Sequence, residues 1–155
     1  MPDNEMFMTA MNKAMALCAA RESCQGEITA KLRSWGINEY DSTRIIDRLK
    51  KDNFINEERY ANGFVKDKFN YNKWGRLKIS AQLRAKNIPG DLIKKALDTL
   101  DNEIYKKTIS DLLISHRRSV KAKNQYDLKA KLLRYGLSKG FESSLLYELL
   151  NMPED

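Results

Sequence analysis

The sequence has 155 residues, of which 42% are hydrophobic and 32% are charged, and its formal net charge is +7. This composition excludes a disordered chain, and the length suits one compact unit or a short series of stacked units. No apolar run approaches the ~18–20 residues of a membrane span, and the acidic start lacks the features of a signal peptide, so we expect a cytoplasmic protein without membrane contact.

Helical periodicity runs through almost the whole chain. Apolar residues recur three and four positions apart, and no stretch shows the sustained apolar and polar alternation of a strand. We therefore predict an all-α fold in which residues 1–8 form a flexible N-terminal tail. The predicted helices are, in chain order, Thr9–Glu22, Gln25–Trp35, Asp41–Lys51, Glu57–Asn70, Gly75–Lys86, Gly90–Leu100, Glu103–Val120, Gln125–Tyr135 and Phe141–Asn151.

The two cysteines, Cys18 and Cys24, lie on the first predicted helix and just before the second. Neither has a further Cys or a His pair at ligand spacing, and a reducing cytoplasm disfavours disulfides. We expect two reduced thiols without a bound metal, and the sequence assigns them no role.

The predicted helices fall into three tandem three-helix repeats, which cover residues 9–53, 54–101 and 102–152. Gly and Asn tolerate the left-handed conformation that ends a helix, and they recur at one column of the alignment. Because three short helices bury little surface alone, neighbouring repeats should share core surface in an elongated, curved array. The alternative is a single globule with chance Leu and Ile spacing. The matched columns are Ile28, Leu32 and Gly36, then Ile79, Leu83 and Asn87, then Leu128, Leu132 and Gly136.

Positive charge is concentrated in two segments. Residues 66–95 hold nine basic and two acidic residues, and residues 117–139 hold eight basic and one acidic. Basic side chains bind phosphates, and aromatic side chains near them can stack on bases. The candidate contact residues are Lys73, Trp74, Arg76, Lys78, Arg84 and Lys86 in the first segment, and Arg117, Arg118, Lys121, Lys123, Lys129, Lys131 and Arg134 in the second.

The sequence contains no recognisable catalytic set. Its single histidine, His116, is followed by two arginines and has no identifiable nucleophile near it. No phosphate-binding P-loop and no dinucleotide-binding glycine motif is found. We therefore predict a protein that is not an enzyme and has no cofactor.

The charge pattern leaves three interpretations open. The basic segments fit solvated faces that maintain solubility, a freestanding helical module that binds nucleic acid, or a scaffold that binds an acidic protein without nucleic-acid contact. Affinity for bare single-stranded DNA distinguishes the module from the scaffold.

Several stretches resemble the patterns of one known family. The residues from Arg21 to Gly36 look like R-x-x-S-x-x-E-L-x-x-K-L-x-x-x-G. Those from Phe54 to Val65 are similar to L-x-D-x-x-[FY]-A-x-x-[FY]-V, although Asn56 and Glu57 stand where an Asp is usual. Residues 75–88 match G-x-x-x-I-x-x-x-L-x-x-K-G-I with Asn87 in place of its second Gly, and residues 140–141 resemble a closing G-F.

The family with these patterns is RecX, and the resemblance covers nearly the whole chain. It implies three tandem three-helix repeats, in agreement with the period of the sequence. It also implies a non-catalytic regulator that binds the RecA recombinase filament and limits its recombinase, ATPase and co-protease activities in DNA repair and the SOS response. We also expect a direct contact with single- or double-stranded DNA and a monomeric state of the free protein.

Overall fold

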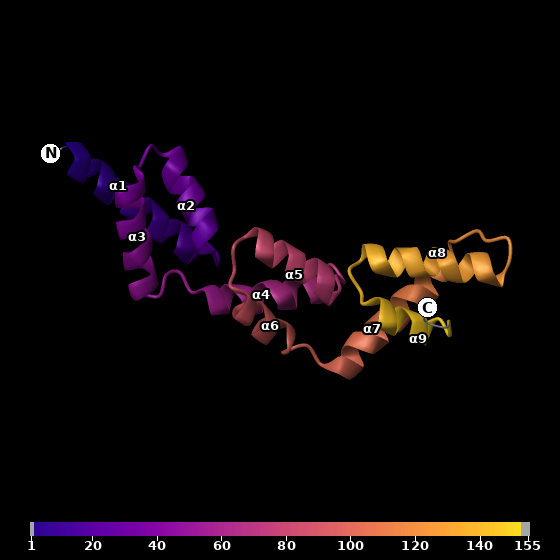
Figure 1. Ribbon diagram of the computed structural model, residues 1–155. Coiled ribbons are helices and arrows are strands. Elements are labelled where there is room, and N and C mark those ends of the chain that lie inside the picture. The colour runs from indigo at the N-terminus through magenta and orange to yellow at the C-terminus, as the bar shows by residue number, and fades with distance from the viewer. Residues whose placement is uncertain (1, 153–155) are drawn as a thin grey trace.

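The computed structural model describes residues 2–152 and confirms the predicted all-α fold. This part of the chain forms an elongated array of nine helices without a strand (Figure 1). None of these helices combines the length and the apolar character that crossing a bilayer requires. The helices are α1 Pro2–Ala20, α2 Gln25–Ser34, α3 Glu39–Lys51, α4 Glu57–Asn70, α5 Arg76–Ala85, α6 Gly90–Leu97, α7 Asn102–Arg117, α8 Gln125–Ser138 and α9 Ser143–Leu149.

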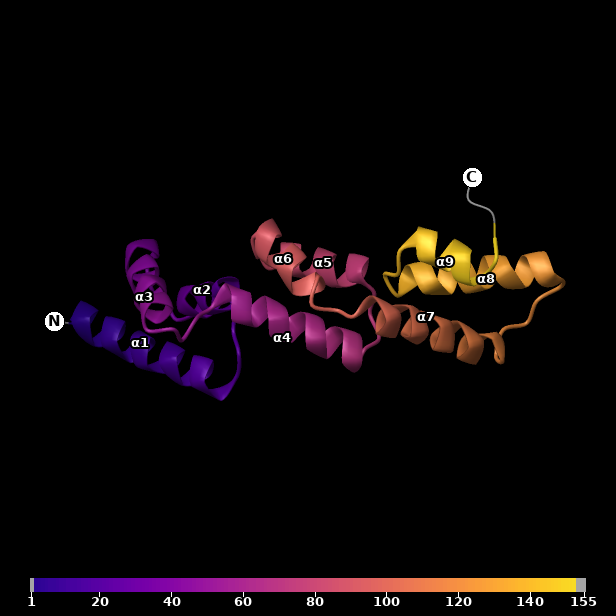
Figure 2. The ribbon, with the colours of Figure 1, turned by 90° about the horizontal axis from the view of Figure 1, so that it is seen from below.

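The helices pack in groups of three. Extensive helix packing occurs within α1–α3, within α4–α6 and within α7–α9. These groups, which we call the first, second and third trio, follow one another along the array (Figure 2). The arrangement is the one expected of short helices that bury one face inside their own unit and another against a neighbour.

The hydrophobic core is divided unequally among the trios. The first trio has its own core, in which Ile28, Leu32 and Ile45 are almost inaccessible to solvent. The second and third trios share a single core, to which Ile79 on α5 and Phe141 before α9 contribute together. The second and third trios therefore form one hydrophobic unit, and Cys24 just before α2 is buried in the same core.

Two glycines bring the backbones of the second and third trios together. The Gly75 N–H donates to the Lys139 carbonyl at 2.7 Å, and the Leu77 N–H donates to the Gly140 carbonyl at 3.0 Å. A β-carbon on Gly75 would lie 2.3 Å from the Gly140 carbonyl oxygen, well inside van der Waals contact. Gly75 has φ −80°, which any residue adopts, so close approach is what requires glycine there.

A polar cluster reinforces this junction. Arg76 forms an ion pair with Glu142 at 2.8 Å and donates to Asn102 Oδ1 at 2.7 Å, while its guanidinium lies 3.9 Å from the centre of the Tyr105 ring. The Tyr105 hydroxyl accepts a hydrogen bond from the Arg76 N–H and donates to Glu142. Burial raises the pKa of Tyr105, so this hydroxyl remains a donor.

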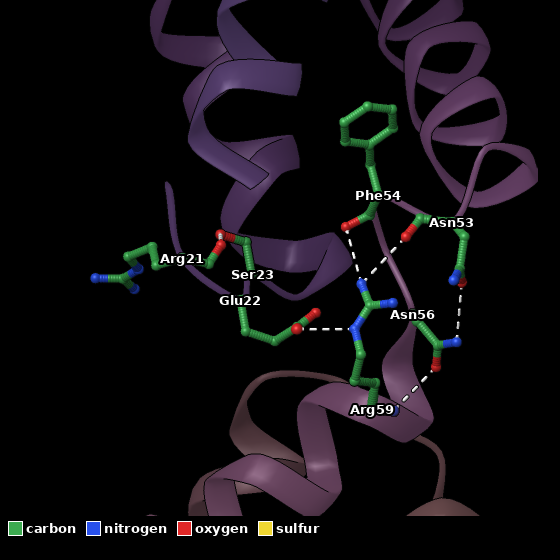
Figure 3. Close-up of polar contacts among 7 residues, drawn as sticks. All are labelled: Arg21, Glu22, Ser23, Asn53, Phe54, Asn56 and Arg59. Atoms are coloured by element: carbon green, nitrogen blue, oxygen red, sulfur yellow. Dashed lines mark hydrogen bonds and ion pairs between the residues drawn. The ribbon is translucent and has the colours of Figure 1, made fainter. Parts of the chain in front are cut away.

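One arginine joins the first and second trios (Figure 3). Arg59 on α4 donates from Nε to the Glu22 carboxylate at 2.8 Å, and from Nη2 to the carbonyls of Asn53 and Phe54 at 3.1 and 3.3 Å. Asn56 caps α4 by accepting the Arg59 N–H at 2.9 Å. Since Glu22 lies between α1 and α2, and Asn53 lies between α3 and α4, Arg59 ties two connections of the first trio to the second.

The predicted N-terminal tail is wrong for residues 2–8, because α1 begins at Pro2; residue 1 lies outside the described residues. Phe7 packs against the first core together with Ala10, Met11 and Ala14, which lie on one helical face with it. The Arg44 guanidinium also lies 4.6 Å from the centre of the Phe7 ring. Tertiary contact therefore stabilises the extra turns. The remaining helix ends differ from the prediction by less than one turn.

The predicted alignment of the third repeat is off by four residues. Helix α8 continues through Gly136, and the left-handed residue is Gly140, with φ +90°, in the place of Gly36 and Asn87. The Phe141 N–H donates to the Gly136 carbonyl just as the Ile37 N–H donates to Leu32. Gly136 is needed for packing, since a β-carbon there would lie 2.4 Å from the Leu146 side chain.

Candidate interaction surface

The aromatic residue of the predicted first site, Trp74, lies between two lysines. The Lys68 Nζ lies 4.9 Å from the centre of the Trp74 ring, and the Lys78 Nζ lies 4.6 Å from it. Trp74 packs against the shared core and is half-buried. A partly exposed ring between two ammonium groups suits a ligand that carries both negative charge and flat apolar groups.

The same alternation continues along α4 and α5. Phe64 lies 5.5 Å from the Lys68 Nζ and 6.0 Å from the Lys86 Nζ, measured to the ring centre. At the other end, the charge on Lys78 is close enough to Lys139 to help lower its pKa, after burial as the main cause. We call this row of side chains the basic–aromatic strip; it consists of Phe64, Lys68, Trp74, Lys78, Lys86 and Lys139.

Local backbone geometry places the tryptophan in the strip. Lys73 adopts a left-handed conformation with φ 56°, and its N–H donates to the Phe69 carbonyl at 3.1 Å. The Trp74 N–H then donates to the Lys68 carbonyl at 3.1 Å. This pair of bonds ends α4 and turns the chain back over its last turn, so that Trp74 and Lys68 meet.

The structure divides the first group of predicted site residues. It brings Trp74, Lys78 and Lys86 together in the strip and leaves Lys73 and Arg84 exposed near the turn and on α5. It engages Arg76 inside the fold, where the guanidinium joins Glu142 and Asn102 and is only 23% exposed. Arg76 therefore stabilises the junction of the trios, and we do not include it in the strip.

The second predicted group runs from the end of α7 through the following connection and along α8 as far as Arg134 (Figure 1). Lys131 forms an ion pair with Asp127 at 3.2 Å and donates to the Lys121 carbonyl, and Lys129 donates to the Asn151 carbonyl. His116 stacks on Tyr135 with ring centres 3.8 Å apart, which gives this histidine a packing role. The exposed cations of this region are Arg117, Arg118, Lys121, Lys123 and Arg134.

Three members of the strip were missed by sequence reasoning. Phe64 is not among the predicted contact residues, and Lys68 and Lys139 lie in the two basic segments without an assigned role. The spacing of Phe64 and Lys68 by four residues places them on one helical face, which is a signal available from the sequence. Lys139 enters the strip only because the second and third trios pack together, and no local sequence pattern predicts this placement.

The strip reaches a cleft between the first and second trios. Arg33, Lys50 and Lys86 line this cleft, which has a volume of about 450 Å³, together with Glu57. One Glu57 oxygen accepts the Gln25 N–H at 3.2 Å, and the other is buried without a hydrogen-bond partner among the described residues. Burial raises the pKa of Glu57, with a further contribution from Glu27.

Replacement of Glu57 by Gln should stabilise the protein near neutral pH. A raised pKa in the folded state means that the charge of Glu57 opposes folding, and this cost grows as the pH rises from the ordinary glutamate pKa through the raised value. We expect Glu57→Gln to gain less than about 1 kcal/mol at pH ~7 and nothing below pH ~4, as measured by urea unfolding. A gain that persists in acid would contradict this explanation.

Other classes of site lack support in the described part of the chain. No group of three or more His, Cys, Asp or Glu side chains there is placed to hold a metal ion. Cys18 and Cys24 form no disulfide, and burial raises the pKa of both thiols. The strip and the cleft beside it are therefore the candidate site.

Comparison with known proteins identifies relatives over almost the whole chain. A family described as "RecX, second three-helix domain" matches residues 56–97, which hold α4 to α6. The Regulatory protein RecX of Clostridium beijerinckii is 31% identical over 153 residues, which cover 96% of this chain and 70% of that protein. The Regulatory protein RecX of Clostridioides difficile is 28% identical over 152 residues, with the same coverage.

Solved structures agree in fold. The crystal structure of RecX from Lactobacillus salivarius superposes with a TM-score of 0.84 at 22% identity and covers 96% of both chains. A second crystal structure, of a regulatory protein RecX, has a TM-score of 0.88 at 21% identity and covers 97% of this chain and 73% of that one. These structures show the same fold, and the 31% identity with the Clostridium beijerinckii protein establishes that the chain belongs to the RecX family of regulatory proteins.

Proposed function

We propose that this protein is a non-catalytic regulator that binds the RecA recombinase filament on DNA and inhibits its recombinase, ATPase and co-protease activities. The observation that carries the proposal is the basic–aromatic strip, where four lysines alternate with two aromatic rings along α4 and α5 and at the junction with α8. Lysines at this spacing suit a phosphate backbone, and the rings suit exposed bases. Membership of the RecX family supports the regulatory role.

The shape of the molecule supports binding along a filament rather than at a point. The strip starts at the cleft between the first two trios and ends at the junction between the last two, so a bound polymer would follow the long direction of the array (Figure 2). The shared core of the second and third trios holds the parts of the strip together across their junction. We propose that the surface acts in the cytoplasm, in DNA repair and the SOS response.

The second candidate function is a freestanding module that binds nucleic acid without a recombinase. The strip favours it as much as it favours the filament, because phosphates and bases are present in both ligands. The two functions differ in stoichiometry. A regulator of the filament acts below one copy per recombinase, whereas a module that competes for DNA acts only after it coats the DNA.

We therefore expect this protein to inhibit ATP hydrolysis by RecA on single-stranded DNA at sub-stoichiometric ratios. The measurement is a titration of the hydrolysis rate at fixed RecA and DNA, with free DNA added in a second series. Inhibition that remains when excess DNA is present supports an action on the filament. Inhibition that begins only when the DNA is saturated would overturn the proposal and favour the freestanding module.

A further inference from the structure

A second surface with different chemistry lies on the third trio. The outer side of α8 and the end of α9 enclose a groove with a volume of about 650 Å³. Its apolar lining comes from Tyr126, Ala130 and Leu133 on α8, with Tyr147 on α9 and Met152 just beyond it. Tyr126 is 80% exposed, so its ring is available to a ligand in the groove.

The apolar side chains of α8 form a stripe with helical spacing. Tyr126, Ala130, Leu133 and Leu137 follow one another at intervals of four, three and four residues, so they lie on one face of the helix. Leu137 extends the stripe beyond the groove and is 44% exposed. Such an i, i+4, i+7, i+11 stripe is the complement of an amphipathic helix that lies along a groove.

Charge determines which helix would fit. Lys129 lies on one side of the stripe and Arg134 on the other, and both line the groove. The nearby connection adds Lys121 and Lys123, both exposed, to the same end of the trio. A groove whose apolar floor lies between two cations favours a partner helix that has an apolar stripe flanked by acidic residues.

We infer that the groove between α8 and α9 is a docking site for an acidic amphipathic helix of a partner protein. The inference goes beyond the proposed function, because it assigns a protein-binding surface separate from the basic–aromatic strip. The strip offers four lysines and two partly exposed rings to a polyanion, whereas the groove offers apolar side chains that a phosphate backbone would leave uncovered. The two surfaces therefore bind different classes of partner.

The test uses a synthetic helical peptide with leucines at the i, i+4, i+7 and i+11 positions and glutamates beside them. Fluorescence anisotropy of the labelled peptide with the full chain should show saturable binding. A scrambled peptide of the same composition, and a version with lysines in place of the glutamates, should each bind at least about tenfold more weakly. Equal binding of the scrambled peptide would reveal a general charge effect and overturn the inference.

Paired variants locate the binding site. Tyr126→Glu/Arg134→Glu should weaken binding of the acidic peptide at least about tenfold, because it removes an aromatic anchor and reverses the charge of one flanking cation. The matched control, Tyr40→Glu/Arg48→Glu, changes a similarly exposed tyrosine and an exposed arginine on α3 and should bind within about twofold of the original protein. Equal losses in both variants would overturn the assignment.

Two competing occupants are distinguished in the same assay. If an oligonucleotide displaces the peptide, and the Tyr126→Glu/Arg134→Glu variant loses both ligands, the groove is a nucleic-acid site and the inference is wrong. If sedimentation shows a dimer that this variant abolishes, a second copy of the chain occupies the groove, and the inference is again wrong. Peptide binding that neither DNA nor self-association affects supports it, whether or not the protein inhibits RecA.

Discussion

Replacement of Gly75 by Ala should reduce the free energy of unfolding by roughly 3 kcal/mol. The added methyl group would lie 2.3 Å from the Gly140 carbonyl oxygen and 2.5 Å from the Phe141 nitrogen, which are backbone atoms and cannot rotate away. The two backbone segments must move apart, and the hydrogen bonds from Gly75 to Lys139 and from Leu77 to Gly140 then weaken. Overpacking costs about 1–3 kcal/mol, and the weakening of two hydrogen bonds worth about 1 kcal/mol each places the loss near the upper end of that range.

A second glycine provides the control. Gly63 lies inside α4, and a β-carbon there would meet nothing within 4 Å. Gly63→Ala should therefore gain roughly 0.5–1 kcal/mol, because alanine loses less conformational entropy in a helix. Urea unfolding followed by circular dichroism gives both values. If Gly75→Ala unfolds at the same urea concentration as the original protein, the junction adapts freely and does not depend on close approach.

The junction matters for function because it holds the strip together. Lys139 belongs to the third trio, whereas the other members of the strip belong to the second. The Lys139 Nζ donates to the Asn72 carbonyl at 2.8 Å, beside the turn that places Trp74. Arg76, Tyr105 and Glu142 fix the same junction from its partly buried side. The surface that we propose for the filament therefore depends on the packing of two trios.

The helices were predictable because their signals are local. Apolar spacing indicated nine helices, and Gly36 and Asn87 ended two of them as expected of residues that tolerate positive φ. The third trio was misaligned because its two glycines have different structural roles. Gly140 ends α8, whereas Gly136 makes room for Leu146, and a single sequence does not distinguish a turn glycine from a packing glycine.

The candidate site was predictable only in part. Clustering of basic and aromatic residues indicated Trp74, Lys78 and Lys86, whose interactions arise within one trio. Arg76 has the same local surroundings but finds its partners 66 and 26 residues away, at Glu142 and Asn102. Charge in the sequence therefore located the surface, but only the tertiary structure shows which cations are already paired.

Reversal of two charges in the strip should abolish most of the regulatory effect. Lys68 and Lys78 flank Trp74, so Lys68→Glu/Lys78→Glu removes both cations beside the ring and introduces repulsion toward phosphates. We expect the concentration for half-maximal inhibition of RecA to rise at least about tenfold. If DNA phosphates are the contact, the salt dependence of binding should also weaken, by about one unit of slope for each lysine.

The control must change the net charge equally outside the strip. Lys94→Glu/Lys107→Glu does so on α6 and α7, where both lysines are exposed and paired only with an aspartate one turn away. Exposed pairs of this kind contribute little to stability, so this variant should fold normally. Circular dichroism of both variants checks that neither loses helix.

The measurement that tests the central claim is a titration of RecA ATP hydrolysis on single-stranded DNA with these two variants and the original protein. The original protein and the Lys94→Glu/Lys107→Glu control should inhibit well below one copy per recombinase, while Lys68→Glu/Lys78→Glu should not inhibit in that range. If the strip variant inhibits as strongly as the control, the basic–aromatic strip is not the surface through which this protein acts on the filament.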